Sequence, residues 1–221
     1  MNVLVYVEGP SDRDALPKLL RSLVDQGKRN GVGIRFIPLG NKERVLNDSP
    51  RKAADHLADA PGDWVFALPD LHPMDAHGSL AGLRKLLMER FTKRADHLRL
   101  PAAVRDHFRV HCLKHDLEVL LLASPEALRQ RLKTQDQLKR AWRQPVEDQD
   151  GDQPPKRVVE QLFDKYRKKP AYQDTVDAPC ILERAELEEV MKMCPQCFAP
   201  LVAELKALAG GESLRPPSPP G

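Results

Sequence analysis

The sequence predicts an α/β fold in which a parallel four-stranded sheet is flanked by helices, followed by a helical C-terminal region. Short apolar runs alternate four times with segments whose apolar residues recur at helical spacing. That alternation is the pattern of strand–helix–strand units with helices on both faces of a sheet. The first run is continuously apolar and rich in β-branched residues, as expected of a strand buried on both faces.

The first unit is predicted near the N-terminus. Val3–Val7 forms the strand, and Glu8-Gly9-Pro10 breaks it. We expect Ser11 to cap the following helix and Gly27 to end it. Pro17 lies inside this helix and lacks a backbone donor, so we expect a kink or an irregular first turn.

Three further strands are expected, at Gly33–Leu39, Asp63–Leu68 and Phe108–Leu113. Residues 40–44 are predicted to form a polar loop after the second strand. Ser49-Pro50 then resembles a helix start, with a cap and a proline at the first helical position, and Pro61-Gly62 resembles its end. A longer basic helix is predicted from Gly78 to about Leu98.

The pattern changes after residue 122, where most of the remaining sequence is typical of helices. We expect helices from Ser124, at Lys156–Lys169, at Ile181–Met193 and at Pro195–Ala209, with a polar acidic loop at 144–155. The predicted organisation is an α/β domain at residues 1–123, a helical region packed on it at 124–209, and a disordered tail at 210–221 that is rich in Pro, Gly and Ser.

The composition predicts a cytoplasmic protein with a modest core. Hydrophobic residues make up 41% of the 221 residues and aromatic residues 5%. No apolar run approaches the ~20 residues of a membrane span. Met1 leads directly into the first predicted strand, so we expect no signal segment and no membrane partner.

The four cysteines do not predict a complete metal site. Cys112 lies in a predicted strand and is expected to be a buried thiol. Cys194-Pro-Gln-Cys197 has the spacing of half a zinc site. No second pair of cysteines or histidines supplies the other two ligands, so structural zinc is disfavoured.

Acidic residues follow three of the predicted strands. Glu8 comes directly after the first strand with Asp12 four residues later, Asp70 follows the third, and Asp116 and Glu118 follow the fourth. If these strands are neighbours, their carboxylates share one edge of the sheet, which is costly unless a cation compensates. A hard divalent cation would suit such oxygen ligands. The alternative is that Asp12 only serves the helix dipole and Glu8 is a solvated turn residue.

These residues resemble the TOPRIM fold, the metal-binding module of topoisomerases, primases and OLD-family nucleases. The resemblance is carried by VEGPSD at Val7–Asp12, by the acid Asp70 after the third strand, and by KHDLE at Lys114–Glu118. It makes the expected fold a TOPRIM-like parallel four-stranded sheet.

The closer resemblance is to a small TOPRIM-like family of unknown function, whose members often lie beside an ATPase in bacterial phage-defence loci. Pro154–Arg157, followed by Phe163, Tyr166 and Lys168, carries it together with the Cys194–Phe198 segment. The similarity covers nearly the whole chain, up to about residue 208. It also favours Cys194 as a residue of a helix turn over a metal ligand.

The resemblance implies two-metal chemistry on phosphodiesters. Glu8, Asp12, Asp70 and Glu118 would hold two Mg²⁺ or Mn²⁺ ions, with Asp116 as a further candidate ligand. Glu8 and Asp70 would thus be catalytic. Lys114 would offset charge in the transition state; alternatively, it is a solvated surface residue.

One segment departs from the family pattern. TOPRIM proteins commonly carry Asp-x-Asp after the strand that precedes Asp70, whereas here His72 takes the place of the second acid and the next acid is Asp75. His72 could bind Mn²⁺, Asp75 could replace the missing ligand, or His72 could be a loop residue without a role.

Lys and Arg outnumber Asp and Glu only by 35 to 32, so the chain as a whole is not strongly basic. Its basic residues are instead concentrated in a few stretches. They gather at 84–99, 129–143 and 156–169. With the resemblance, these stretches favour sequence-nonspecific contact with nucleic-acid phosphates; without it, they are ordinary solvated helix faces.

Two functions are therefore expected as alternatives. The first is a metal-dependent nuclease, the effector of an anti-phage defence system linked to an ABC/SMC-type ATPase. The second is a catalytically inactive binding or regulatory subunit that keeps the TOPRIM shell, which His72 in place of an acid favours.

Overall fold

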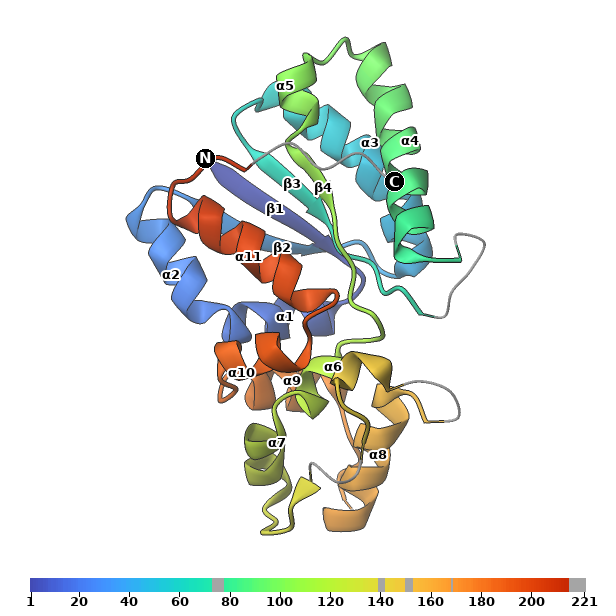
Figure 1. Ribbon diagram of the computed structural model, residues 1–221, viewed down its shortest axis with the longest axis vertical. Coiled ribbons are helices and arrows are strands. Elements are labelled where there is room, and N and C mark those ends of the chain that lie inside the picture. The colour runs from blue at the N-terminus through green and yellow to red at the C-terminus, as the bar shows by residue number, and fades with distance from the viewer. Residues whose placement is uncertain (73–77, 139–141, 150–152, 168, 215–221) are drawn as a thin grey trace.

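The fold class predicted from the sequence is confirmed by a computed structural model, which describes residues 1–72, 78–138, 142–149, 153–167 and 169–214. Four parallel strands form one sheet in the order β2-β1-β3-β4 (Figure 1). The strands are β1 (Asn2–Val7), β2 (Gly33–Pro38), β3 (Trp64–Ala67) and β4 (Phe108–Val110). Strand β1 lies between two neighbouring strands, and Val3–Val7 are buried on both faces of the sheet, which explains the continuous apolar sequence of β1.

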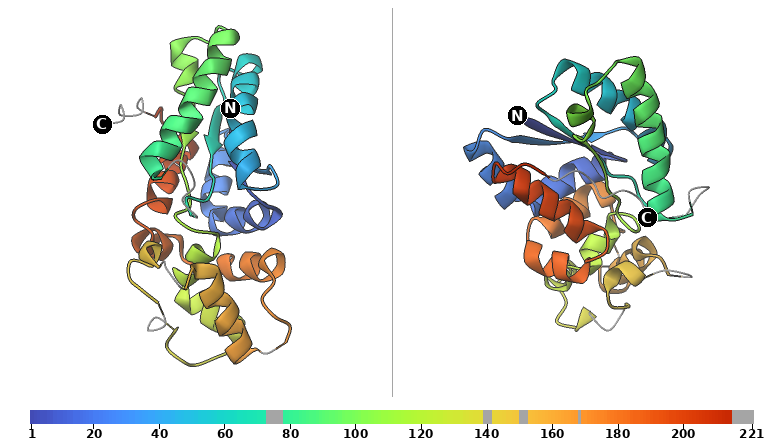
Figure 2. Two further views of the ribbon diagram at one scale, coloured as in Figure 1. Left: turned by 90° about the vertical axis from the view of Figure 1, so that its right-hand side faces the viewer. Right: turned by 45° about the horizontal axis from the view of Figure 1, so that its top comes forward.

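Helices cover both faces of the sheet (Figures 1 and 2). Val3, Val5 and Val7 of β1 face a core built with α1 (Pro10–Leu19), α2 (Arg21–Arg29) and α11 (Phe198–Ala209). Leu4 and Tyr6 face the second core, built with α3 (Lys42–Asp59) and α4 (Leu80–His97). Successive residues of one strand thus contribute to opposite layers. A short helix that was not predicted, α5 (Ala102–Arg105), precedes β4.

The remaining helices form a lobe beyond the carboxyl edge of the sheet (Figure 1). They are α6 (Glu118–Leu122), α7 (Pro125–Leu132), the 3₁₀ helix η2 (Val146–Asp148), α8 (Pro155–Tyr166), α9 (Asp174–Leu182) and α10 (Leu187–Met193). Helix α9 packs along α1, and one hydrophobic cluster runs from the sheet into this lobe. The division at residues 123 and 124 therefore stays a prediction. Leu214, in the predicted tail, packs against the same cluster, and 215–221 lie outside the described residues.

The start of α1 differs from the prediction. Gly9, not Ser11, is the N-cap residue, and Pro10 occupies the first helical position, where its missing donor costs nothing. The Gly9 N–H donates to Asp12 Oδ2 at 2.8 Å. The helix does not stop at Gly27, which lies inside α2; the chain instead turns at Leu20, between the two helices.

Two other helix predictions were wrong. Helix α3 begins at Lys42, capped by Asn41, whose Oδ1 accepts from the Arg44 N–H, so 40–44 is not simply a loop and Pro50 lies within the helix. The single helix expected at Ile181–Met193 is divided between α9 and α10. Helix α9 was missed because it contains Pro179, which signals a helix end in sequence.

The buried cysteine was predicted correctly. Cys112 is buried just beyond β4, with its Sγ 3.4 Å from Cys197 Sγ, and Cys194 is buried as well. In the described part of the chain, no helix combines the length and apolar character needed to cross a membrane.

Candidate functional site

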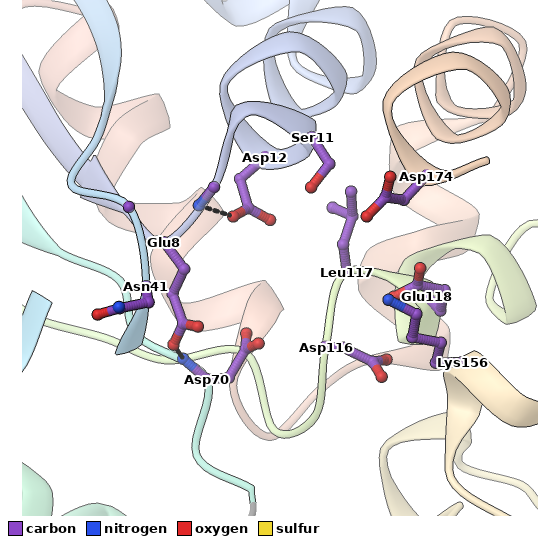
Figure 3. Close-up of a pocket in the computed structure, with 12 residues that line it drawn as sticks. Glu8, Ser11, Asp12, Asn41, Asp70, Asp116, Leu117, Glu118, Lys156 and Asp174 are labelled. Carbon is purple, nitrogen blue, oxygen red and sulfur yellow. Dashed lines mark hydrogen bonds between the residues drawn. The ribbon is translucent and has the colours of Figure 1, made fainter. Parts of the chain in front are cut away.

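A cavity of about 240 Å³ lies at the carboxyl edge of the sheet, where the α/β layer meets the helical lobe (Figure 3). Its lining includes six acidic residues and one basic residue: Glu8, Asp12, Asp70, Asp116, Glu118, Asp174 and Lys156. Figure 3 shows Glu8 and Asp70 on one side, and Glu118, Asp174 and Lys156 on the other. The cavity is therefore strongly acidic.

The sheet topology brings the first of these acids together. Strands β1, β3 and β4 are neighbours, so the residues that follow them meet at one edge, as the sequence reasoning assumed. Glu8 follows β1, and its Oε1 accepts from the Asp70 N–H at 2.8 Å. Asp70 in turn forms a parallel bridge with Leu113, which extends the pairing of β3 and β4 beyond the strands. Glu8 is thus fixed against the neighbouring strand end instead of being a solvated turn residue.

Asp12 combines a local role with a place in the cavity. One of its carboxylate oxygens satisfies the Gly9 N–H at the start of α1. Burial nevertheless raises its pKa to about 6, and the carboxylates of Glu118 and Asp174 act in the same direction, while the Gly9 N–H opposes them. The helix-start interpretation of Asp12 is correct, and Asp12 also belongs to the acidic group.

Burial disfavours ionisation of Asp70, Asp116 and Glu118, and neighbouring carboxylates add to the effect at Asp70 and Asp116. Burial raises the pKa of Asp70 well above its usual range, and the carboxylates of Glu8, Asp12, Asp116 and Glu118 raise it further. Burial and the neighbouring Glu118 raise the pKa of Asp116 to about 8. Burial also raises the pKa of Glu118, whose side chain is only 3% exposed. Lys156 partly compensates, because it lowers the pKa of Asp116 and Glu118.

The donor set fits a hard divalent cation in its chemistry. All the acidic side chains offer oxygen ligands, which Mg²⁺ and Mn²⁺ prefer. Asp116 Oδ1 is buried without a hydrogen-bond partner, so one acceptor remains available. The side chains are not drawn together, however: among the described residues, no three His, Cys, Asp or Glu are grouped so that they could hold one ion. Binding would therefore require side-chain rearrangement.

Two predicted site residues point elsewhere. The His72 ring stacks on His115 with centroids 4.7 Å apart, and His72 does not line the cavity. Lys114 Nζ donates to Asp148 Oδ1 at 2.6 Å and to Gln196 Oε1 at 2.9 Å, so its ammonium is held by the lobe and is also absent from the lining. Asp75 lies outside the described residues.

Four polar lining residues were not predicted as site residues, among them Ser11, which was expected only as a helix cap. Lys156 is the second residue of α8, within the Pro154–Arg157 segment, whose sequence gave no sign that it would meet the strand ends. Asp174 begins α9, the helix that was missed. Asn41 reaches the cavity from the start of α3. An acid or amide at a helix start is a visible signal, but it is common to most helices.

Comparisons with known proteins show likeness to solved structures. No curated protein matches this chain. The C-terminal region of the Burkholderia pseudomallei OLD protein is 18% identical, over 94% of this chain and 98% of that one, with a TM-score of 0.48. The C-terminal region of the Xanthomonas campestris pv. campestris OLD protein is 16% identical, over 95% of each chain, with a TM-score of 0.46. At TM-scores below 0.5 the likeness is too loose to transfer residues or activity.

The family comparison is more extensive. The match covers residues 7–206, which include strands β2, β3 and β4, the last residue of β1 and all the acids of the cavity. The chain belongs to the family described as Domain of unknown function (DUF4276).

Proposed function

We propose that this chain is a metal-dependent nuclease that hydrolyses phosphodiester bonds. The observation that carries the proposal is the cavity itself, where six acidic residues from separate elements and Lys156 line one space of about 240 Å³. The raised pKa values of Asp70 and Asp116 support it. Without a cation, ionising all the carboxylates of the cluster is unfavourable, and a bound cation would stabilise their charged forms. The resemblance of VEGPSD and KHDLE to TOPRIM motifs supports the same chemistry.

The proposed ligands come from two sides of the cavity wall. Glu8, Asp12 and Asp70 would hold Mg²⁺ or Mn²⁺ from the sheet side, and Asp116 and Glu118 from the lobe side, with two ions expected. Such ions, when bound, polarise the phosphoryl group and activate water. Glu8 is already oriented by the Asp70 N–H, which donates to its Oε1 at 2.8 Å. Lys156, in place of Lys114, is the cation positioned to meet a phosphoryl group.

The proposed substrate is a nucleic acid bound without sequence specificity. Several basic residues of α4 are used within the fold: Arg84 donates to Val110 O, Arg90 to Leu46 O, and Arg94 to Asp55. Helix α8, in contrast, presents exposed Lys156 at the cavity, and the exposed Arg157 follows it outside the lining. We therefore assign phosphate contact to the start of α8.

The test is calorimetry with Mn²⁺ and Mg²⁺ on the wild-type chain and on a Glu8→Gln, Asp70→Asn double variant. The expected result is binding to the wild type that is lost in the double variant. Cleavage of DNA and of RNA would then be screened with the ion that binds. A wild-type chain that binds neither ion, even with nucleic acid present, would refute the nuclease.

The second candidate function is a catalytically inactive subunit of an ATPase complex. It is favoured because, within the described residues, no three potential ligands are grouped to hold an ion, and because His72 stacks on His115 instead of replacing the missing acid. In either case we propose an ABC/SMC-type ATPase partner in an anti-phage system, on the family resemblance alone. The inactive subunit would bind that ATPase stably and cleave nothing with any divalent metal.

Lys156→Gln is expected to lower the rate of cleavage about 10²-fold, because it removes the cation that faces the developing phosphoryl charge. Mn²⁺ affinity should be unchanged or tighter, since Lys156 competes electrostatically for Asp116 and Glu118. The matched control is Arg157→Gln, the neighbouring residue outside the cavity lining. Single-turnover cleavage and calorimetry measure both effects. Equal loss in the two variants would mean that Lys156 serves only general phosphate attraction.

A further inference from the structure

Glu147 is a buried carboxylate that the proposed chemistry does not use. It lies in η2 and is only 1% exposed. Its Oε2 accepts from the Gln196 N–H at 2.6 Å, and its Oε1 accepts from the N–H groups of Cys197 and Phe198 at 2.8 and 3.2 Å. Glu147 therefore satisfies three backbone donors at the start of α11, where a negative charge is favourable.

Residues of η2 and of the segment before α11 also bind the two residues that precede Asp116. Lys114 Nζ bonds both Asp148 and Gln196, and the Gln196 side chain donates to Asp148 Oδ1 at 3.0 Å, which closes a triangle. His115 Nε2 donates to the carbonyl oxygen of Glu147 at 3.1 Å. The His115 ring is buried and stacked on His72. Two consecutive side chains before Asp116 are thus attached to η2 or to the start of α11.

These attachments supplement other anchors of the acidic segment, such as the His72 N–H, which donates to the Lys114 carbonyl oxygen at 3.1 Å, and Leu117, which is buried in the core. Residues 114–117 have no helical or strand hydrogen-bond ladder, and α6 begins only at Glu118. Helix α11 packs on the sheet through the buried side chains of Leu201 and Leu205. An attachment to α11 therefore fixes the acidic segment relative to the sheet, whose strand ends carry Glu8 and Asp70.

We propose that Glu147, Asp148 and Gln196 form a positioning clamp, which acts through Lys114 and His115 to hold Asp116 and Glu118 over the cavity. This inference rests on the proposed function, since positioning has a chemical consequence only if the acids bind an ion. It assigns Lys114 as a positioning residue of the clamp, which explains why a lysine between a strand end and the acids faces away from the cavity.

Two variants with opposite changes in charge test the clamp. Glu147→Gln keeps one oxygen acceptor but turns an amide donor toward a backbone N–H, and Lys114→Met removes the ion pair at similar length. Both should weaken Mn²⁺ binding about tenfold, measured by electron paramagnetic resonance at a temperature where circular dichroism shows both variants folded. Direct electrostatics predicts opposite signs, because one variant removes a negative and the other a positive charge near the acids. Tighter binding by Lys114→Met would overturn the clamp.

Asp63→Asn is the matched control, since Asp63 is a buried carboxylate that accepts from Asn2 and His56 at the opposite end of the sheet. It should lose stability and keep wild-type Mn²⁺ affinity; a loss of affinity equal to that of Glu147→Gln would reduce the clamp to general stability. Hydrogen exchange of the metal-free protein provides a second readout. Amides of 114–120 should exchange faster in Glu147→Gln than in Asp63→Asn, and unchanged exchange there would overturn the clamp. Failure of the wild type to bind Mn²⁺ would instead refute the proposed function, because the exchange measurement needs no metal.

Discussion

Glu8→Gln is expected to lower the rate of metal-dependent cleavage by a factor of about 10³, with little change in the free energy of unfolding. Glutamine retains the oxygen that accepts from the Asp70 N–H, so the bond between the ends of β1 and β3 is preserved. What it removes is the negative charge that would bind the ion. Nuclease assays with Mn²⁺ and chemical denaturation in EDTA measure the two quantities separately.

Glu183→Gln is the matched control for this substitution. Glu183 carries the same charge but pairs with Lys18 on the surface, with its side chain 44% exposed, and it does not line the cavity. Its cleavage rate should stay within about twofold of the wild type, because exposed pairs contribute little. A fully active Glu8→Gln variant would exclude Glu8 as a ligand, whereas an unfolded one would mean that the negative charge of Glu8 is needed for the fold itself.

Five of the six acids of the cavity could be predicted because their positions follow from topology. In a parallel sheet, residues after neighbouring strands share an edge, so the positions of Glu8, Asp70 and Asp116 follow once β1, β3 and β4 are recognised. The sixth acid, Asp174, could not. Asp174 reaches the cavity because α9 packs along α1, more than 150 residues away in sequence, and no local pattern records that contact.

Side-chain direction was harder to predict than position. Lys114 was correctly placed at a strand end, but its ammonium follows Asp148 and Gln196, which lie 34 and 82 residues further along the chain. His72 was likewise placed beside Asp70, but its ring packs on His115. A residue just after a strand has no ladder to fix its side chain, so distant partners decide where it points. The same reason explains why Lys156, and not Lys114, lines the cavity.

Asp116→Asn is expected to stabilise the metal-free protein at pH 8 while it weakens Mn²⁺ binding. The pKa of Asp116 is raised from 3.8 to about 8 by burial and by Glu118, so the folded state retains a proton that the unfolded state has lost. Its contribution to stability is therefore fully present below about pH 4 and is lost as pH rises toward 8. Asp12, with a pKa of about 6, adds to this slope at its lower end. Asparagine cannot ionise and removes the Asp116 part of the dependence.

Denaturation in EDTA at pH 5 and pH 8 measures the effect. The variant should be more stable than the wild type by about 1–3 kcal/mol at pH 8, which is less than the full shift implies because the site can relax and Lys156 compensates. At pH 5 the difference should fall to about a third of that value, because the unfolded carboxyl is already mostly ionised there. Asp63→Asn should behave oppositely, because the pKa of Asp63 is lowered by its hydrogen bonds from Asn2 and His56, which outweigh its burial. Its carboxylate stabilises the fold above the unfolded pKa, so the substitution should be destabilising at both pH values. If Asp116→Asn is instead less stable than the wild type at pH 8, the carboxylate is held by favourable contacts, and the acidic cavity does not need a cation to offset it.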